Sequence, residues 1–530
     1  MTSYRPSVPF STRYARNGMV CSIDHLASSA GVSVLRKGGT AADAAIAASA
    51  VLAVTSQHMC GVGGDLWALV HIPGEPRPFA LNASGHSGSG ADLDTLHRDG
   101  LREMPFHKDP RSVPIPGCVD GWFALHQRFG RLPLDEIFAD AIDLANEGFP
   151  LSVECAQATK LLEGVANTED YFANGLPRPG ELIRRSGLGE TLEAIIDGGR
   201  DAFYEGTFGE ELIAFGAGEY TREDLQSIQA DWVEPLGIEA FGQRIWSLPP
   251  NSQGYLCLSS AWIANQLDLP TDTSDPLFWH LLAEASLQAG FDRPDVLHQD
   301  ADGHSLLDPE RLLPRASAIS PLQTSRLPTG VNDGDTIYLN AIDADRMGVS
   351  LIQSNASGWG ALVFLPKSRI SLHNRGIGFS PSPESPAAYG ARKRPPHTLA
   401  PTLVENLDGT LRALVGTMGG DSQPQVVLQL LARLFVAGED PGQALAAPRW
   451  RFASSSSNGF NTWAKPGEVI LEIEGEQSSL IENLQLLGHI VNSLPANNSA
   501  FGHAHIICAE TNVLSGAAEP RVSASGTSAY

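Results

Sequence analysis

A threonine at the boundary between two differently patterned segments is the first residue that could take part in a reaction. Thr336 follows the polar stretch 328–335 and precedes the apolar run 337–342. A threonine hydroxyl is a weak nucleophile unless a base removes its proton. If the bond after Asp335 were cut, the new amine of Thr336 could be that base, because an α-amino group has a reference pKa of about 8. Before cleavage the same hydroxyl could attack the Asp335 carbonyl and form an ester that water opens. From local sequence alone, a β-branched residue starting a core strand is the simpler interpretation.

A glycine-rich turn supplies a second chemical element. Gly416-Thr-Met-Gly-Gly-Asp421 lies between a predicted strand and a predicted helix. Glycines let backbone N–H groups approach a ligand closely, and a helix N-terminus adds partial positive charge. Acyl transfer needs donors where negative charge develops on oxygen. The turn is therefore a candidate oxyanion hole, and a plain strand-to-helix turn is the alternative.

Hydrophobic periodicity predicts the elements that must position these residues. Strands are expected at 66–70, 337–342, 349–353, 361–364, 402–404, 411–415, 468–473 and 505–509. Helices are expected at 27–37, 41–54, 134–146, 192–197, 223–228, 277–289, 421–436 and 478–487. Thr40 with Asp43 is a predicted capping box. Residues 110–300 are expected to be mainly helical, and 300–335 to form an exposed, turn-rich segment of the kind that proteolysis attacks.

A second glycine run, Cys60-Gly-Val-Gly-Gly-Asp65, precedes the predicted strand at 66–70. It lacks the GxGxxG spacing and the flanking elements of a dinucleotide site. A tight turn beside a close backbone contact is the favoured interpretation.

Composition excludes several classes of protein. The chain of 530 residues has a formal charge of −24, so its surface would repel polyphosphate and nucleic acid is not an expected partner. Six scattered cysteines without a CxxC pair argue against a disulfide framework or a zinc cluster. We see no metal or cofactor signature, no signal peptide and no apolar run long enough to span a membrane, so the expected location is the cytoplasm.

Several ordered motifs resemble the γ-glutamyltranspeptidase family over nearly the whole chain. In the N-terminal part they are Asn17-Gly-Met-Val20, Leu26-Ala-Ser-Ser-Ala-Gly31, Val34-Leu-Arg-Lys-Gly-Gly-Thr-Ala-Ala-Asp-Ala-Ala45 and Ser112-Val-Pro-Ile-Pro-Gly117 with Gly121. In the C-terminal part they are Lys393-Arg-Pro395, Pro401-Thr402, Gly419-Gly420 and Ala447-Pro-Arg449. With these markers, catalysis by Thr336 is favoured over a structural role.

The resemblance implies an α+β fold, a four-layer αββα sandwich of the N-terminal nucleophile hydrolase type. It implies a precursor that cuts itself between Asp335 and Thr336 into a large subunit, 1–335, and a small subunit, 336–530, held together as one globular unit. Thr336 would be the nucleophile, with the hydroxyl of Ser354 as its hydrogen-bonding partner. Gly419 and Gly420 would form the oxyanion hole.

The expected substrate pocket departs from the family pattern. Asn355, Arg375, His397, Thr398 and Asp421 are the candidate substrate-binding residues. The family's amine-binding amide and carboxylate positions are occupied by Arg375 and Gly378, and its serine pair by His397-Thr398. Its carboxylate-binding arginine is missing from 84–93. An arginine repels an ammonium group and attracts a carboxylate, unless it serves in a structural salt bridge instead.

This pattern is similar to the branch of oxamate amidohydrolases and transpeptidase-like proteins. The predicted function is hydrolysis of a small carboxylate-bearing amide such as oxamate through an acyl-enzyme. A glutathione hydrolase or γ-glutamyltransferase and a cephalosporin-type acylase are alternatives within the fold. A processed but non-catalytic binding protein, or an unprocessed scaffold, is the alternative from another class. The implied partners are the amide substrate and the two subunits, with a further oligomer left open.

Overall fold

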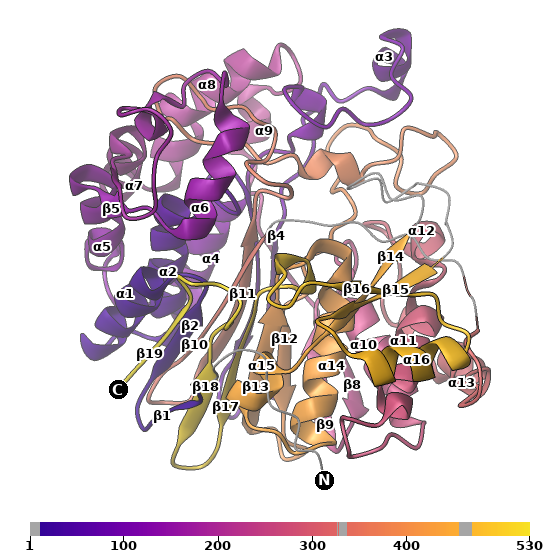
Figure 1. Ribbon diagram of the computed structural model, residues 1–530. Coiled ribbons are helices and arrows are strands. Elements are labelled where there is room, and N and C mark those ends of the chain that lie inside the picture. The colour runs from indigo at the N-terminus through magenta and orange to yellow at the C-terminus, as the bar shows by residue number, and fades with distance from the viewer. Residues whose placement is uncertain (1–10, 326, 328–335, 455–468) are drawn as a thin grey trace.

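Two antiparallel sheets of seven strands each form the centre of the protein. The computed structural model describes residues 11–325, 327, 336–454 and 469–530. The two sheets stack face to face, and helices cover the outer face of each (Figure 1). The predicted four-layer αββα sandwich is therefore confirmed.

Both sheets combine strands from before and after Thr336. The first has the order β1 (Arg13–Ala15), β18 (Leu514–Ala517), β17 (Ala504–Ala509), β13 (Leu411–Thr417), β12 (Thr402–Glu405), β9 (Gln243–Ser247) and β8 (Leu236–Ala240). The second has the order β19 (Gly526–Ala529), β2 (Met19–Ser22), β10 (Ile337–Ile342), β11 (Gly348–Ser354), β3 (Asp65–His71), β4 (Phe79–Ala83) and β7 (Asp231–Val233). Segments 11–325 and 336–530 thus share both sheets and one fold.

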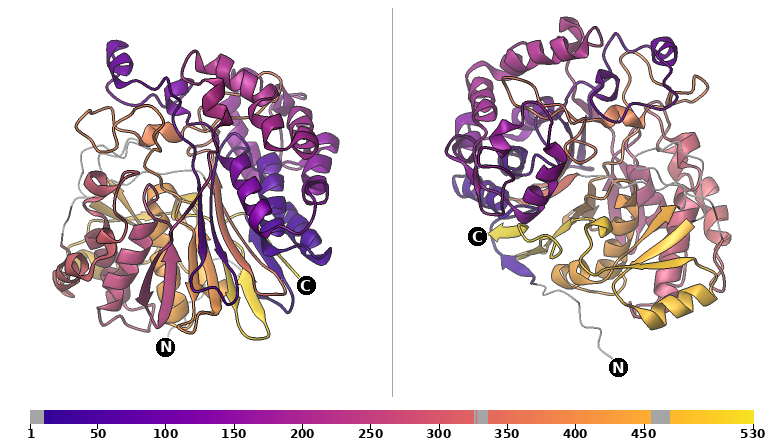
Figure 2. Two further views of the ribbon diagram at one scale, coloured as in Figure 1. Left: turned by 180° about the vertical axis from the view of Figure 1, so that it is seen from behind. Right: turned by 45° about the horizontal axis from the view of Figure 1, so that its top comes forward.

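Two groups of helices form the outer layers, and Figure 2 shows them from behind and from above. The second sheet is covered by α1 (His25–Arg36), α2 (Ala41–Thr55), α4 (Cys118–Phe129), α5 (Leu134–Glu147), α7 (Ser186–Tyr204) and α8 (Thr207–Gly216). The first is covered by α10 (Gly254–Asn265), α11 (Pro276–Gly290), α13 (Pro309–Ser317), α14 (Gln423–Phe435), α15 (Pro441–Ala446) and α16 (Ser478–Leu486).

Short elements complete the described chain. The remaining helices are α3 (Leu93–Arg98), α6 (Val153–Ala158), α9 (Arg222–Gln226) and α12 (Arg293–Val296). A small sheet contains β14 (Trp450–Ser454), β15 (Val469–Glu474) and β16 (Val491–Leu494), and a two-stranded one contains β5 (Phe149–Pro150) and β6 (Leu182–Ile183).

The strand that follows Thr336 shows how the layers are held. Side chains alternate between the two faces of a strand. On β10, Ile337, Leu339 and Ala341 face the helices of the second sheet. Tyr338 and Ile342 enter the core between the sheets. The strand is therefore buried on both faces, which explains its nearly continuous apolar sequence.

Most predicted elements are confirmed. The Thr40–Asp43 capping box starts α2, and the hairpin predicted at 337–353 is β10 and β11. The strand predicted at 361–364 is wrong, because this part forms only an isolated bridge between Phe364 and Ser371. Most helix predictions match within a few residues, as for α5, α11 and α16. The helix predicted at 192–197 is too short, because α7 extends from Ser186 to Tyr204.

Two broad segments contain elements that periodicity missed. Within the mainly helical 110–300, strands β7 and β8 occupy sheet edges and β9 lies next to β8. All three are short and only partly buried, so they contain few apolar residues. Within 300–335, helix α13 forms despite an internal proline. The predicted cleavage segment 328–335, with Asp335, lies outside the described residues.

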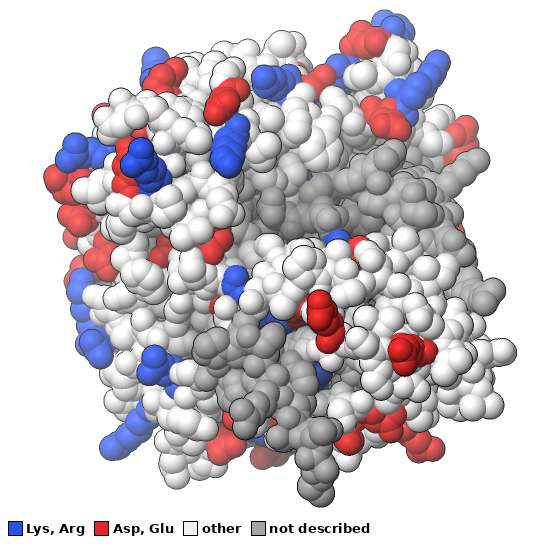
Figure 3. All heavy atoms as spheres, in the orientation of Figure 1, with Lys and Arg blue, Asp and Glu red and all other residues white. Residues whose placement is uncertain are grey.

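The surface fits the acidic composition. Figure 3 shows basic and acidic side chains interspersed on one face, mainly along its left and upper margins. Among the described residues, no helix combines the length and apolar character needed to cross a bilayer.

Candidate active site

The Thr336 hydroxyl lies beside the Ser354 hydroxyl, where β10 begins and β11 ends in the middle of the second sheet. Thr336 is 1% exposed, and its Oγ1 is 2.9 Å from Ser354 Oγ. The antiparallel register of Ile337 with Gln353 places the two side chains together at the end of the hairpin. Ser354 Oγ also accepts a hydrogen bond of 2.8 Å from the N–H of Ala356. Its own proton can therefore be donated to Thr336 Oγ1, which would stabilise a developing alkoxide.

Asn355 is tied to the turn before β3. Its backbone N–H donates to Met59 O over 3.0 Å, and its side-chain amide donates to Gln57 O over 3.0 Å. The glycine run beside it has no room for side chains, since a Cβ on Gly64 would lie 2.2 Å from the carbonyl oxygen of Ser354. The predicted close backbone contact at 60–65 is therefore confirmed. Asn355 Oδ1 is buried without a hydrogen-bond partner among the described residues, so it is an acceptor available to a bound group.

The candidate oxyanion loop follows β13. A Cβ on Gly416 would lie 2.4 Å from the ring of Tyr338, so only glycine lets β13 pack this closely on β10. The loop then turns through Gly419, whose φ of +136° is strained for any residue with a side chain. Gly420 begins the short 3₁₀ turn ahead of α14. Because β10 starts where β13 ends, the glycine pair and Thr336 share one end of the sandwich.

A series of hydrogen bonds connects the glycine loop to the predicted substrate-binding residues. Gln253 Nε2 donates to Gly420 O over 2.9 Å and to Thr398 O over 2.8 Å. Arg375 Nη1 donates to Thr398 Oγ1 over 3.0 Å. Burial lowers the pKa of Arg375, and the charges of Asp65 and Asp421 only partly compensate. A buried cation of this kind favours an additional anion.

Asp421 is paired with an arginine that the sequence did not suggest. Arg293 Nη1 lies 2.5 Å from Asp421 Oδ1 and 2.7 Å from Gln253 Oε1. Both charged side chains are almost fully buried, at 6% and 3% exposure. The negative charge of Asp421 is therefore neutralised within the protein.

His397 faces Asp65. Its Nε2 lies 2.7 Å from Asp65 Oδ2, while its Nδ1 accepts from the N–H of Leu399 over 3.2 Å. Nε2 therefore carries the proton and donates it to the carboxylate. Burial lowers the pKa of His397 to about 4, so the ring is neutral at neutral pH. Burial alone would raise the pKa of Asp65, but His397 and His373 outweigh it and keep the carboxyl ionised.

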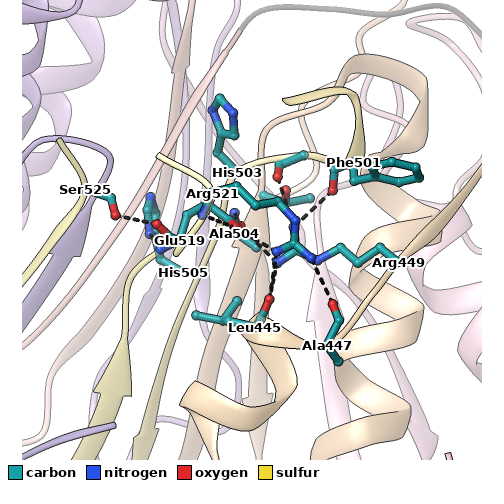
Figure 4. Close-up of polar contacts among 12 residues, drawn as sticks. Leu445, Ala447, Arg449, Phe501, His503, Ala504, His505, Glu519, Arg521 and Ser525 are labelled. Atoms are coloured by element: carbon teal, nitrogen blue, oxygen red, sulfur yellow. Dashed lines mark hydrogen bonds and ion pairs between the residues drawn. The ribbon is translucent and has the colours of Figure 1, made fainter. Parts of the chain in front are cut away.

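A buried ion-pair network supports the glycine loop from behind (Figure 4). Arg449 donates to the carbonyls of Phe501 and Gly502 over 3.0 and 2.9 Å and pairs with Glu519 over 2.9 Å. A Cβ on Gly502 would lie 2.7 Å from Met418 O, so this turn packs directly on the start of the loop. Glu519 also pairs with Arg521. The network thus holds the segment on which the oxyanion loop rests.

In this network, burial and the neighbouring charges together determine the pKa of each group. Burial, together with the charge of Arg521, lowers the pKa of Arg449 to about 10. Burial would raise the pKa of Glu519, but the two arginines lower it to about 2. All these groups are therefore charged at neutral pH and depend on one another.

Three residues of this site were missed by sequence reasoning. Asp65, Gln253 and Arg293 are brought to it from distant elements. Asp65 is the last residue of the glycine run at 60–65. Gln253 and Arg293 carried no local pattern that distinguishes them from ordinary polar residues.

Comparison with known proteins agrees with this fold. The family model described as gamma-glutamyltranspeptidase matches residues 27–529. The chain is 34% identical to the oxamate amidohydrolase proenzyme of Klebsiella pneumoniae, over 96% of this chain and 98% of that protein. It is 33% identical to the glutathione hydrolase-like YwrD proenzyme of Bacillus subtilis, over 95% and 97%. The solved cephalosporin acylase from Bacillus halodurans is 30% identical, with a TM-score of 0.88 over 100% of this chain and 99% of that one.

The layered fold is that of the N-terminal nucleophile hydrolases, and the protein is a hydrolase. It belongs to the γ-glutamyltranspeptidase family.

Ser354→Ala removes the hydroxyl beside Thr336 and should lower turnover about 10- to 100-fold, the effect of one lost hydrogen bond to a reacting group. Ser354→Thr keeps a hydroxyl and should retain most activity. Steady-state kinetics with purified variants measure the difference. Equal activity of the alanine and threonine variants would contradict a supporting role for this hydroxyl.

Arg449→Met breaks the buried network and should lower the free energy of unfolding by about 3–5 kcal/mol, because Phe501 O, Gly502 O and Glu519 lose their donor. Arg77→Met is the matched control, since its pair with Glu234 is about half exposed and should contribute less than about 1 kcal/mol. Urea unfolding measures both. Similar losses in the two variants would show that the network carries no special stability.

Proposed function

We propose that the protein is a self-processing amidohydrolase in which Thr336 is the nucleophile. The observation that carries the proposal is the buried hydrogen bond between the hydroxyls of Thr336 and Ser354 at the start of a core strand. It supports a nucleophile because a hydroxyl beside Thr336 Oγ1 can donate to the negative charge that develops on this oxygen. The glycine loop at the same end of the sandwich supports it independently.

Processing would begin with attack of Thr336 Oγ1 on the carbonyl carbon of Asp335. The bond between that carbon and the Thr336 nitrogen breaks, and the nitrogen takes up the hydroxyl proton. Water then hydrolyses the resulting ester and leaves a carboxylate on Asp335 and an amine on Thr336. The subunits 1–335 and 336–530 stay together because each contributes strands to both sheets.

Turnover would use the amine as the base. In its neutral form it takes the proton from Thr336 Oγ1 as the oxygen attacks the substrate amide. The N–H groups of Gly419 and Gly420 stabilise the oxyanion, and Ser354 donates to Thr336 Oγ1. The protonated amine gives its proton to the leaving nitrogen. Water hydrolyses the acyl-enzyme and restores the hydroxyl, so the cycle needs no cofactor.

The charge pattern favours a substrate with a carboxylate near the scissile amide. A glutamyl ammonium group would need an anionic partner, but Asp421 is paired with Arg293. A substrate carboxylate would instead offset the burial of Arg375, and Thr398 fixes the position of that guanidinium. Oxamate, in which a carboxylate adjoins an amide, has this chemistry. The name of the Klebsiella pneumoniae relative supports the same substrate class.

Two alternatives remain within this mechanism. Glutathione hydrolysis or γ-glutamyl transfer is supported by the name of the Bacillus subtilis relative, and cephalosporin acylase activity by the solved structure from Bacillus halodurans. Each predicts a different preferred substrate but the same processing. A non-catalytic binding protein would retain the fold and lack turnover of any amide.

Thr336→Ala should abolish both processing and activity. On a denaturing gel the wild-type protein should give two bands, corresponding to residues 1–335 and 336–530, and the variant a single full-length band. Thr410→Ala, at an exposed turn, is the control and should process normally. A single full-length band in active wild-type protein would refute self-cleavage.

Arg375→Met should raise KM for oxamate at least tenfold, because the proposed carboxylate partner is lost. Arg392→Met is the control, since Arg392 is exposed. Ammonia release from oxamate and p-nitroaniline release from γ-glutamyl-p-nitroanilide are measured on processed protein. Faster wild-type turnover of the glutamyl compound, dependent on its α-amino group, would refute the carboxylate-amide proposal and leave the nucleophile proposal intact.

A further inference from the structure

Two histidines and a glutamate meet in a buried cluster that plays no part in the proposed reaction. His280 and Glu284 lie one turn apart on α11, and His489 follows α16. Their exposed fractions are 0%, 0% and 8%. One ligand atom from each lies within 4.8 Å of the others. The first two belong to segment 1–335 and the third to segment 336–530, so the cluster spans the proposed cleavage.

The hydrogen bonds around the cluster fix which atoms face its centre. His280 Nε2 lies 2.7 Å from Ser320 O, so this nitrogen carries the proton and donates it. Its Nδ1 therefore presents a lone pair, and it lies 2.7 Å from His489 Nε2. The Glu284 carboxylate accepts from Thr324 Oγ1 over 2.6 Å and from the N–H of Ser325 over 2.9 Å.

We propose that His280 Nδ1, His489 Nε2 and a Glu284 carboxylate oxygen bind a zinc ion. Two ligands four residues apart on one helix with a third from elsewhere is a common arrangement of zinc ligands. Mixed imidazole and carboxylate donors favour zinc over calcium or magnesium, which prefer oxygen alone. The protonated nitrogen of His280 is held by a backbone carbonyl, and Glu284 is held by two donors, as ligands in metal sites usually are.

Zinc binding requires a change of tautomer and a small movement. In the present contact His489 Nε2 donates its proton to His280 Nδ1, so His489 would have to carry the proton on Nδ1 before Nε2 could bind the ion. A zinc–nitrogen distance of about 2.0–2.1 Å with tetrahedral angles separates two ligand nitrogens by about 3.3 Å. His489 would move by a few tenths of an ångström from its present 2.7 Å contact with His280. His489 lies between α16 and β16, outside regular structure, so its side chain can make that shift. Water would complete the coordination.

The ion would hold residues 320–325 in place. Residues 320–325 contact the cluster through Ser320, Thr324 and Ser325, and the Thr324 N–H donates to Leu487 O over 2.9 Å. This short segment therefore lies between α11 and the end of α16, at the lower right of Figure 1. A metal there would tie this segment and α11 to the residues that follow α16, and would act as a structural cross-link.

The test begins with metal analysis of protein purified by ion exchange, without a metal column. Wild-type protein equilibrated with Zn²⁺ and then desalted should retain about one zinc per chain. His280→Ala and His489→Ala should retain at least tenfold less, and the exposed control His304→Ala should match wild type. Zinc retained by His489→Ala at the wild-type level would overturn the proposal.

A measurement on the wild-type protein alone guards against variants that fail to fold. Protein stripped with dipicolinate should unfold at a lower Tm, and Zn²⁺ should restore it. Co²⁺ added to the stripped protein should give visible d–d absorption that saturates at one equivalent. Absence of the band together with an unchanged Tm would overturn the proposal. Because Thr336→Ala should bind zinc equally well, failure here is separate from failure of the proposed reaction.

Discussion

The contact between Tyr338 and Gly416 is the constraint on which the site depends. It joins the two sheets close to both candidate catalytic elements: Tyr338 lies two residues after Thr336, and Gly416 lies three residues before Gly419. Any side chain at 416 would push the sheets apart at this point. Polar contacts reinforce the same interface, because Ser350 Oγ lies 3.0 Å from both Tyr338 Oη and Thr402 O. The spacing between Thr336 and the glycine loop is thus fixed by packing between the two sheets and does not rely on a flexible loop.

Around this contact, buried arginines form ion pairs with buried carboxylates. Arg449, Glu519 and Arg521 form one set behind the glycine loop, and Arg293 with Asp421 forms another beside it. Burial of an unpaired charge is costly, so each partner holds the other in place. Burial lowers the pKa of Arg375 although Asp65 and Asp421 lie nearby, and Thr398 accepts a hydrogen bond from its guanidinium. The buried charged side chains at this end of the sandwich are therefore held in place by ion pairs and hydrogen bonds.

The sequence predicted the layers and the hairpin after Thr336 better than it predicted the pocket. A role for Thr336 was predicted from the γ-glutamyltranspeptidase markers, since local sequence alone favoured a residue that starts a core strand. The hairpin to Ser354 follows from simple periodicity. Gln253 and Arg293 could not be found in this way. They become neighbours of Gly420 and Asp421 only when the first sheet and its helices assemble. Likewise β7, β8 and β9 were not predicted within a mainly helical segment, since these short strands at and next to the sheet edges are only partly buried and contain few apolar residues.

The histidine–glutamate cluster likewise could not be predicted from the sequence, because its members come from distant parts of the chain. His280 and Glu284 alone form an i, i+4 pair that any amphipathic helix can contain. The third member, His489, lies 209 residues further along the chain. What distinguishes the cluster is burial together with fixed orientation, since Ser320 holds the proton of one histidine away from the other. Glu284 is held beside the same pair by Thr324 and Ser325, residues that only the folded chain brings to α11, so no sequence motif marks the three ligands as one group.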